Sequence, residues 1–313
     1  MARYLVTGAT GFVGHRLAEA LLARGDHVRC LVRDPERAAW LRELGAELVA
    51  GDVTQPASLR GVAEGVGVVY HLAARGIAPA PVVEATNIGG TRDLLRESQA
   101  AGVTAFVYTS SGTVYGDQRG AWVDEGSPVH PSFAYPRSKL EAERLLLEAR
   151  AGSGFPCHIA RVAAVYGEGS PMLMAERVRR GRMRLINGGR NYGSWIHVDD
   201  LVRVLLLLPE RGKVGRIYVV GDDHPAQLRE FYAFIAERLG ASPPGSMPLS
   251  LAKAVFGLAG LVARLNGREA RMPPDLLKMM TLSHRLNNRR MKEDLGIELR
   301  YPTFREGLAE VLR

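Results

Sequence analysis

The segment from Thr7 to Gly14 constrains the fold of this chain most strongly, because it places three glycines directly after an apolar strand at residues 4–6. Gly8, Gly11 and Gly14 suit a tight turn, close approach of the backbone to a pyrophosphate, and close packing of the next helix on the strand. The first turn of that helix offers free N–H groups and a positive dipole end to phosphates. The spacing therefore favours a dinucleotide-binding βα unit over an ordinary β–α turn.

Short apolar strands alternate with helical segments through the first half of the chain. Strands are expected at 4–6, 27–32, 47–50, 66–72, 103–109 and 157–161, and helices at 12–24, 36–44, 82–101 and 135–151. Repeated strand–helix units with right-handed crossovers predict an α/β, Rossmann-type doubly wound parallel sheet, with its ligand crevice at the carboxyl ends of the strands. We expect this domain to occupy residues 1–166.

The alternation of strands and helices becomes less regular after residue 166. This change predicts a smaller, mostly helical, discontinuous C-terminal substrate lobe over residues 167–313. Segments near 195–220 are expected to return to the sheet. The apolar stretch 251–265 is interrupted by Lys253 and Arg264, and no apolar run reaches the roughly 18 residues that a membrane span needs. The stretch favours a packed core or lid helix over a membrane contact.

The charge and cysteine content exclude some classes of function. The net charge is +8, but Lys and Arg alternate with Asp and Glu, and the densest basic patches, 177–184 and 285–292, lack interleaved aromatic residues. This pattern predicts solvated helix faces rather than nucleic-acid binding, with an anionic ligand as the alternative. Cys30 and Cys157 lie in apolar stretches and are expected to be buried free thiols. With a strand so close to the first residue we expect no signal peptide, and hence a cytoplasmic protein.

The end of the second strand bears on the choice of dinucleotide. NAD-binding turns place a carboxylate there to bind the ribose hydroxyls, whereas this chain has Val32 followed by Arg33, with Asp34 displaced by one residue. Arg33, together with Arg37, could pair with a 2′-phosphate. The sequence therefore favours NADP over NAD. Asp52, which closes the third strand, fits either a contact with the adenine amine or a capping role.

Tyr135 and Lys139 are four residues apart, so they share one face of the expected helix. A phenol with a pKa near ~10 is a poor base at neutral pH, and a neighbouring cation stabilises the phenolate. Ser111 follows the fifth strand at the crevice, where its hydroxyl can hold a substrate oxygen. With a dinucleotide this set could transfer a hydride and a proton. The alternative for Tyr135 and Lys139 alone is an ordinary surface pair.

The histidines give weaker signals. His71 ends an apolar strand and is predicted to be a hydrogen-bonded core residue. His197 precedes Asp199 and Asp200, which are expected to cap and open a helix. No His, Asp or Glu set has metal-ligand spacing, so no metal site is predicted.

Several motifs occur in a fixed order and together resemble the extended short-chain dehydrogenase/reductase superfamily over nearly the whole chain. They are the glycine turn, Gly51-Asp52-Val53, His71-Leu72-Ala73-Ala74, Asn87-Ile88-Gly89-Gly90-Thr91, 110–116, Tyr135-Pro136-Arg137-Ser138-Lys139, 161–167 and 195–201. The resemblance implies that Tyr135 is the general acid/base, that Lys139 lowers its pKa and binds the nicotinamide ribose, and that Ser111 binds the substrate oxygen. It also implies a homodimer that pairs through the helices at 82–101 and 135–151.

The residues expected to bind the cofactor combine the glycine turn, the strand ends and the catalytic helix. They are Gly8, Thr10, Gly11, Phe12, Val13, Arg33, Asp52, Val53, Leu72, Ala73, Ala74, Asn87, Thr109, Tyr135, Lys139, Val162 and Ala163.

Two departures distinguish branches of the superfamily. Nucleotide-sugar epimerases and dehydratases usually carry Asn where this chain has Ala164, and dehydratases carry an Asp-Glu pair where it has Gly112-Thr113. The chain is more similar to the 3β-hydroxysteroid dehydrogenase and dihydroflavonol-reductase-like branch. This resemblance implies reversible NADP(H)-dependent hydride transfer to a ketone or aldehyde. The alternatives are a nucleotide-sugar epimerase or dehydratase with tightly bound NAD, in which Arg179, Arg182 and Arg190 hold the diphosphate, and a non-catalytic NADP sensor, which the intact Ser-Tyr-Lys set disfavours.

Overall fold

A seven-stranded parallel sheet forms the centre of the computed structural model, which describes residues 2–266 and 273–313. Met1 and residues 267–272, which belong to the two predicted domains, lie outside the described residues. The strand order is β3-β2-β1-β4-β5-β7-β12, which confirms the doubly wound arrangement predicted from the alternating elements. The strands are β1 (Arg3–Thr7), β2 (His27–Val32), β3 (Glu47–Ala50), β4 (Val68–His71), β5 (Ala105–Ser111), β7 (Cys157–Val162) and β12 (Ile217–Val220).

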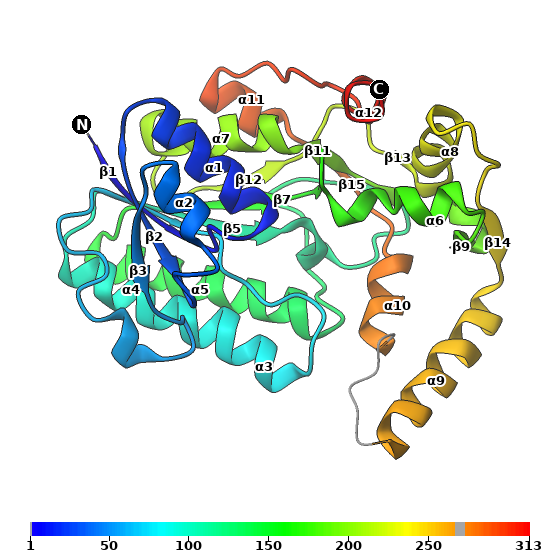
Figure 1. The fold of residues 1–313 in the computed structure, drawn as a ribbon, viewed down its shortest axis with the longest axis horizontal. Coiled ribbons are helices and arrows are strands. Elements are labelled where there is room, and N and C mark those ends of the chain that lie inside the picture. The colour runs from blue at the N-terminus through cyan, green and yellow to red at the C-terminus, as the bar shows by residue number, and fades with distance from the viewer. Residues whose placement is uncertain (1, 267–272) are drawn as a thin grey trace.

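Helices cover both faces of the sheet (Figure 1). Successive residues of a strand point to opposite faces, and accordingly Val6 packs in one apolar core and Leu5 in the other. The first core lies beneath α1 (Phe12–Ala23), α2 (Ala39–Glu43), α7 (Val198–Arg211) and α11 (Arg289–Leu295). The second lies beneath α4 (Gly90–Ala100) and α5 (Ala134–Ser153). The helix expected at 82–101 is formed by α3 (Ala80–Glu84), a π-helical turn (Ala85–Gly89) and α4.

The C-terminal lobe packs around a third core in which Trp195, Phe231 and Phe304 contact one another. The expected segment 195–198 forms β11, which pairs with β8 rather than with the seven-stranded sheet, whereas β12 joins that sheet. The other helices are α6 (Ala175–Arg179), α8 (Leu228–Arg238), α9 (Leu249–Leu265), α10 (Pro274–Thr281) and α12 (Phe304–Val311). The short strands are β6 (Trp122–Val123), β8 (Ala164–Tyr166), β9 (Arg184–Ile186), β10 (Tyr192–Gly193), β11 (Trp195–His197), β13 (Ala226–Gln227), β14 (Gly245–Met247) and β15 (Arg285–Leu286). Single 3-10 turns occupy Pro56–Leu59, Gly112–Tyr115, Pro171–Leu173 and Asn187–Gly189.

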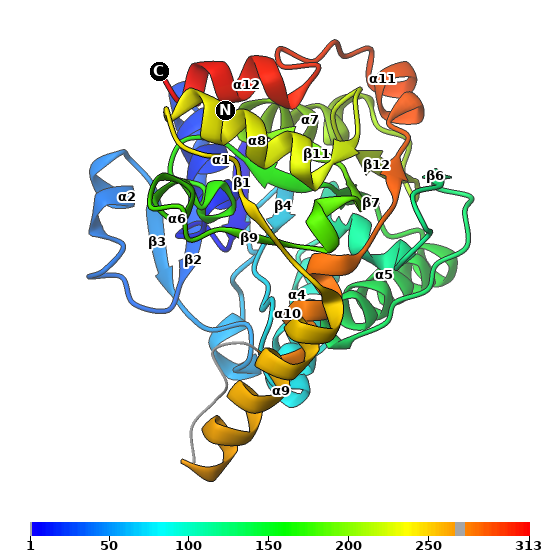
Figure 2. The same cartoon turned by 90° about the vertical axis from the view of Figure 1, so that its right-hand side faces the viewer.

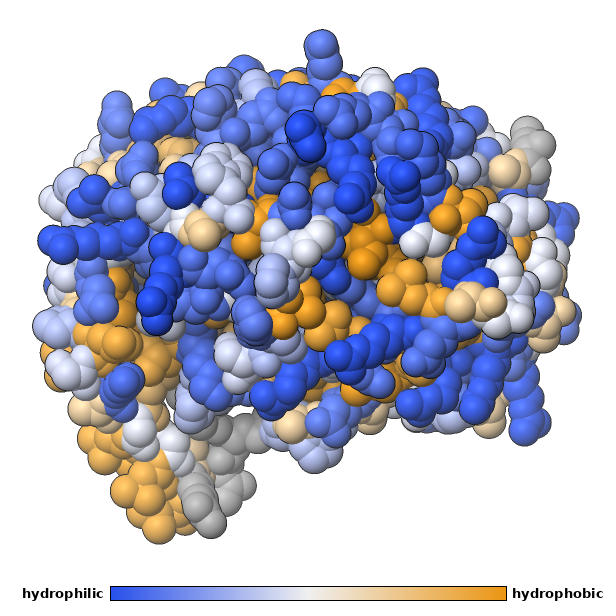
Figure 3. Space-filling view, turned by 180° about the vertical axis from the view of Figure 1, so that it is seen from behind, coloured by the Kyte–Doolittle hydropathy of each residue, from blue (hydrophilic) through white to orange (hydrophobic). Residues whose placement is uncertain are grey.

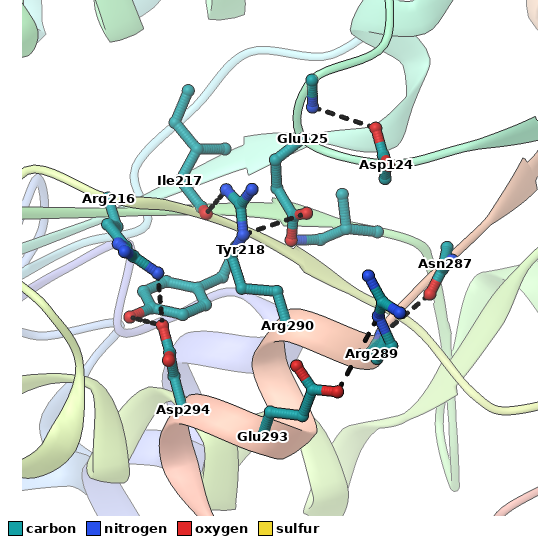
Figure 4. Close-up of polar contacts among 12 residues, drawn as sticks. Asp124, Glu125, Arg216, Ile217, Tyr218, Asn287, Arg289, Arg290, Glu293 and Asp294 are labelled. Carbon is teal, nitrogen blue, oxygen red and sulfur yellow. Dashed lines mark hydrogen bonds and ion pairs between the residues drawn. The ribbon is translucent and has the colours of Figure 1, made fainter.

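Polar contacts protect the edge strand β12 and fix α11 against it (Figure 4). The Glu125 carboxylate accepts a hydrogen bond from Val219 N at 2.9 Å, so an N–H group of the edge strand is satisfied by a side chain. Arg290 of α11 pairs with the same carboxylate at 3.4 Å. Asp294, one turn further along α11, accepts a hydrogen bond from the Tyr218 hydroxyl at 3.1 Å. These contacts hold α11 against the edge of the sheet.

The apolar sequence of α9 favoured a packed core or lid helix, and of these two the packed core helix is wrong. Together with α10 it projects from the body of the molecule (Figures 1 and 2), and only Ala252 and Phe256 of its described side chains are buried. Among the described residues, no helix combines the length and the apolar character needed to cross a bilayer.

Candidate active site

The glycine turn between β1 and α1 is as tight as its sequence predicted. Gly11 N donates to Gly8 O at 2.9 Å, and Gly8 has a φ of +74°, which favours glycine. A Cβ on Gly14 would lie 2.1 Å from Gly8 O, so only glycine allows α1 to approach the strand this closely. Gly11 is the N-cap of α1 and supplies no side-chain acceptor, which leaves the first N–H groups of the helix available to a phosphate. Thr10 is exposed and Phe12 and Val13 are partly buried at this helix end.

The end of β4 lies directly against the glycine turn. A Cβ on Gly8 would be 2.8 Å from Ala73 N, and Ala73 N donates to Thr7 Oγ1 at 3.1 Å. Leu72 and Ala73 are partly buried and Ala74 is exposed, so the predicted cofactor-lining segment runs along the turn. The structure thus brings the expected residues of β1 and β4 together.

The side-chain amide of Asn87 forms hydrogen bonds within the protein and is not presented as a free amide to a cofactor. It lies in the π-helical turn, its Oδ1 accepts from Arg75 N at 2.7 Å, and its Nδ2 donates to Arg75 O at 2.9 Å and Ser138 Oγ at 2.8 Å. Its amide therefore fixes the loop after β4 to helix α5. Ser138 was not among the residues that the sequence predicted for this site.

Arg33 is exposed at the end of β2 and forms no hydrogen bond or ion pair in the described part of the chain. The adjacent Asp34 accepts from the backbone of Glu36 and Arg37, and its carboxylate pairs with the Arg37 guanidinium at 3.3 Å. This capped turn explains why α2 begins at Ala39 and not at residue 36 as expected. The structure leaves Arg33 unpaired among the described residues, while Arg37 is exposed and pairs with Asp34.

Asp52 and Val53 follow β3 in a turn. The Asp52 carboxylate accepts from Thr54 N and Thr54 Oγ1, both at 2.8 Å, through a single oxygen, Oδ1. Val53 is buried, and a Cβ on Gly90 would lie 2.8 Å from its Cβ. Val53 is therefore a packing residue between this turn and α4.

Ser111, Tyr135 and Lys139 come from two elements that meet at the carboxyl edge of the sheet. Ser111 ends β5, while Tyr135 and Lys139 lie in the first turns of α5. Lys139 Nζ donates to Thr109 O at 2.7 Å and lies 5.9 Å from the centre of the Tyr135 ring. Ser111 Oγ accepts from Thr113 N at 3.2 Å and lies 2.8 Å from Thr113 Oγ1. The three predicted catalytic side chains thus form one cluster.

The protonation of this cluster differs from the expectation for Tyr135. Burial raises the pKa of Tyr135 above its ordinary value, and the Ser111 hydroxyl acts in the opposite direction. Burial also lowers the pKa of Lys139 to about 7, an effect that the Glu143 carboxylate opposes. A Lys whose pKa is near neutrality, held beside a protonated phenol, is poised to change its charge at working pH.

His71 is the core residue that its sequence predicted. Thr91 Oγ1 donates to Asn87 O at 2.6 Å and lies 2.9 Å from His71 Nε2, so Nε2 carries the proton. His71 Nδ1 then accepts from Thr7 Oγ1 at 2.7 Å. Burial and the nearby charge of Lys139 lower the pKa of His71 to about 3, which keeps the ring neutral.

Sequence reasoning missed a buried network directly behind the cluster. Glu143 and Arg161 form a bidentate ion pair, with Arg161 Nη2 2.7 Å from Oε2 and Nε 3.1 Å from Oε1, and both side chains are almost fully buried. Ser110 Oγ hydrogen-bonds the same carboxylate, and Tyr115 OH lies 3.0 Å from Arg161 Nη1. The available signal was Glu143 itself, one helical turn beyond Lys139 on the same face.

Val162 and Ala163 follow Arg161 at the end of β7. Val162 is buried and Ala163 is partly buried, with Ala163 N donating to Val220 O at 2.8 Å. In the β5–β7 ladder Ser111 is level with Val162, so both segments end beside the catalytic cluster.

In the lobe the structure corrects the predicted cap of α7 and shows where two of the arginines considered for a diphosphate lie. His197, rather than Asp199, is the N-cap of α7, because its Nδ1 accepts from Asp199 N. Arg179 pairs with Glu176 at 3.1 Å. Arg190 instead lines a cavity of about 800 Å³, formed by residues 186–188, Arg190, Asn191, Arg229, Ser246, Pro248 and Thr281.

The fold and this cluster define an α/β oxidoreductase-type site in an enzyme of the extended short-chain dehydrogenase/reductase class. The sequence profile of the NAD-dependent epimerase/dehydratase family matches residues 4–221, and the chain belongs to this family.

Similar proteins include several reductases and dehydrogenases. The chain is 32% identical to a 4-hydroxy-2-methyl-3-oxo-4-farnesyl-3,4-dihydroquinoline-1-oxide ketoreductase of Stigmatella aurantiaca, over 98% of this chain and 94% of that protein. It is 29% identical to a 3 beta-hydroxysteroid dehydrogenase/Delta 5→4-isomerase of Mycobacterium tuberculosis, over 100% of this chain and 90% of that protein. A dTDP-glucose 4,6-dehydratase of Streptomyces venezuelae, solved with NAD bound, superimposes with a TM-score of 0.80 at 25% identity, over 99% of this chain and 96% of that one.

Proposed function

We propose that this chain is an NADP(H)-dependent oxidoreductase that interconverts an apolar ketone or aldehyde and the corresponding alcohol. The observation that carries the proposal is the cluster of Ser111, Tyr135 and Lys139, in which Lys139 is fixed on the Thr109 carbonyl beside the Tyr135 ring. A farnesylated-quinoline ketoreductase and a steroid dehydrogenase among the similar proteins support an apolar carbonyl or carbinol substrate.

The glycine turn fits a dinucleotide, since its backbone leaves no room for side chains and its helix N–H groups are free. The nicotinamide, when bound, supplies the hydride that the carbonyl carbon receives, or accepts it in the reverse direction. Tyr135 donates its phenolic proton to the carbonyl oxygen, while the Ser111 hydroxyl holds that oxygen. A charged Lys139 then stabilises the phenolate that remains. Arg33 would bind the 2′-phosphate.

The second candidate is a nucleotide-sugar epimerase or dehydratase with retained NAD. The observation in its favour is Arg190, which lines the polar cavity of the lobe together with Arg229. Against a dehydratase, Gly112 directly follows Ser111, and a Cβ there would lie 2.8 Å from Leu286 Cδ1, so an acidic side chain at this position would require Leu286 to shift. We also propose a homodimer that pairs through the α3–α4 segment and α5.

The deciding experiment compares Tyr135→Phe with Tyr70→Phe, a control on β4 outside the cluster. We expect Tyr135→Phe to lower kcat by about 10²- to 10⁴-fold while the Kd for NADPH stays unchanged, and Tyr70→Phe to leave both unchanged. The assay is NADPH consumption with a panel of apolar ketones and aldehydes. Unchanged turnover in Tyr135→Phe would exclude the proposed acid, and turnover of a UDP- or dTDP-sugar without net cofactor consumption would favour the second candidate.

A further inference from the structure

The exposed apolar side chains of the molecule are concentrated on one helix. Of the eleven large apolar side chains that are exposed in the described part of the chain, six belong to α9. They include Leu258, which is 64% exposed, and Leu265, which is 77% exposed. The other five are scattered singly over the described part of the chain, which is ordinary for a folded protein. A continuous apolar surface on one projecting helix is not, and it indicates a binding face.

This face is continuous along the whole length of α9. The exposed residues fall at 251, 255, 258, 262 and 265, with 261 beside them, and this spacing of three and four places them on one side of a helix. The opposite side carries the buried Ala252 and Phe256. Figure 3 shows the result as a projecting apolar surface, in contrast to the largely polar surface of the body.

The charged residues of α9 have one sign. The sequence contains no Asp or Glu between Arg238 and Arg268, whereas Lys253 and Arg264 lie within α9 itself. With 3.6 residues per turn, the exposed Lys253 lies on the side of α9 that points away from this apolar face. A helix with one apolar face, whose charged residues are all cations, complements a surface that is apolar inside and anionic at its border, which describes a bilayer with acidic headgroups.

A bilayer surface fits these observations better than a second copy of the chain. Paired helices of identical chains use opposite charges beside the apolar seam to fix their partner, and α9 has no acid to pair with Lys253. With 17 residues, α9 falls short of a bilayer span, and a helix of this kind lies in the interface plane.

The base of the α9–α10 hairpin lies next to the catalytic loop. Pro248, just before α9, and Thr281, at the end of α10, both line the cavity of the lobe. Three residues after Thr281, His284 Nδ1 is 3.1 Å from Gly116 O, and its Nε2 would be 3.6 Å from a Cβ on Gly112. Gly112 directly follows Ser111. A surface that holds α9 would therefore also hold the lobe that borders the catalytic cluster.

We propose that the apolar face of α9 docks on an anionic lipid bilayer and positions the catalytic crevice at its surface. The docking is independent of the proposed reaction, because it rests on the exposed face of α9 and its charges alone. It gives an apolar substrate a short path from the bilayer to the lobe.

The test is flotation of the full-length protein with vesicles of equal parts phosphatidylcholine and phosphatidylglycerol. We expect the wild type to float with these vesicles, to bind pure phosphatidylcholine vesicles at least about tenfold less, and to be released in part by high salt. Leu258→Glu and Leu265→Glu should each lower the floated fraction at least tenfold. The matched control is Leu44→Glu, since Leu44 is 47% exposed at the far side of the sheet domain and should float like the wild type.

Two readouts keep the result unambiguous. Because Leu258 and Leu265 are exposed, both variants should melt at the wild-type temperature and keep wild-type NADPH binding. Absence of wild-type flotation, or equal flotation of Leu258→Glu and wild type, would overturn the proposal. Sedimentation that shows a wild-type oligomer dissociated by Leu258→Glu would assign the face to a second copy and overturn it as well.

Discussion

The buried pair of Glu143 and Arg161 allows the sharpest prediction about stability. The side chains are 2% and 5% exposed, and the carboxylate is bound by the guanidinium in bidentate fashion and by Ser110. Glu143→Gln removes the negative charge and leaves the guanidinium buried without a counter-charge, which costs about 3–5 kcal/mol. With about 2.1 cal/mol/K of unfolding entropy per residue, a chain of 313 residues should lose about 5–8 °C in Tm.

Differential scanning calorimetry measures this shift, and the same helix provides the control. Glu141 and Arg144 form a pair at 3.1 Å on the exposed face of α5, and Glu141→Gln should cost less than about 1 kcal/mol. The double variant Glu143→Leu/Arg161→Met should recover most of the loss, because it removes both buried charges together. Equal Tm losses in Glu143→Gln and Glu141→Gln, or a double variant as unstable as the single one, would refute the reasoning.

Glu143→Gln has a second consequence in the catalytic cluster. The Glu143 carboxylate raises the pKa of Lys139 against the larger effect of burial, which holds it at about 7. Without that charge the pKa falls further, so Lys139 loses its proton at lower pH. In the proposed mechanism a charged Lys139 is required, and the basic limb of the kcat profile should therefore move to lower pH. A merely structural role of Glu143 would leave this limb in place.

Two further predictions concern the cofactor and pH. Arg33→Ser should raise KM for NADPH by about 10- to 100-fold, as expected for loss of a charged hydrogen bond, and leave KM for NADH nearly unchanged; equal effects on both cofactors would exclude Arg33 as the 2′-phosphate ligand. Burial lowers the pKa of His158 to about 4 and that of His71 to about 3, against 6.5 for the ordinary group. The unfolded chain therefore binds more protons between these values, so the stability that the two neutral histidines contribute is complete above about pH 6.5, and Tm should fall as the pH drops below it. His158→Leu should make this decline shallower, and a Tm that rises on acidification would contradict the assignment.

The sequence was sufficient for the parallel sheet and for the location of the catalytic cluster. Strand and helix alternate with clear periodicity from β1 to β7, and Gly8, Gly11 and Gly14 permit very few backbone geometries. Because parallel strands end at the same edge, residues that follow β1, β4 and β5 had to meet there. Ser111, Tyr135 and Lys139 could be grouped for this reason without any coordinates.

The parts that sequence could not predict depend on which surfaces are covered. The apolar spacing of α9 is the same for a core helix and for a helix with one open face, and tertiary packing alone distinguishes them. The direction of the pKa of Tyr135 was likewise misjudged. A neighbouring Lys lowers the pKa of a phenol when the Lys is charged, but burial raises the pKa of Tyr135 and lowers that of Lys139 at once. Glu143 could not be linked to Arg161, since nothing in the sequence shows that the two elements face each other.

A series of buried and partly buried hydrogen bonds connects the glycine turn with Lys139. Thr7 binds His71 Nδ1, His71 O accepts from Thr109 Oγ1 at 3.2 Å, and Thr109 O accepts from Lys139 at 2.7 Å. A charged His71 would repel Lys139, so the neutral ring is a condition for this arrangement. The links join neighbouring strands of one parallel sheet, and the register of β1, β4 and β5 therefore fixes the distance between the nucleotide end and the proton-transfer end. Because this arrangement is rigid, substitutions at the two ends should change different kinetic parameters. Arg33→Ser should change KM and Tyr135→Phe should change kcat, whereas a substitution that disturbs the hydrogen bonds of His71 should change both.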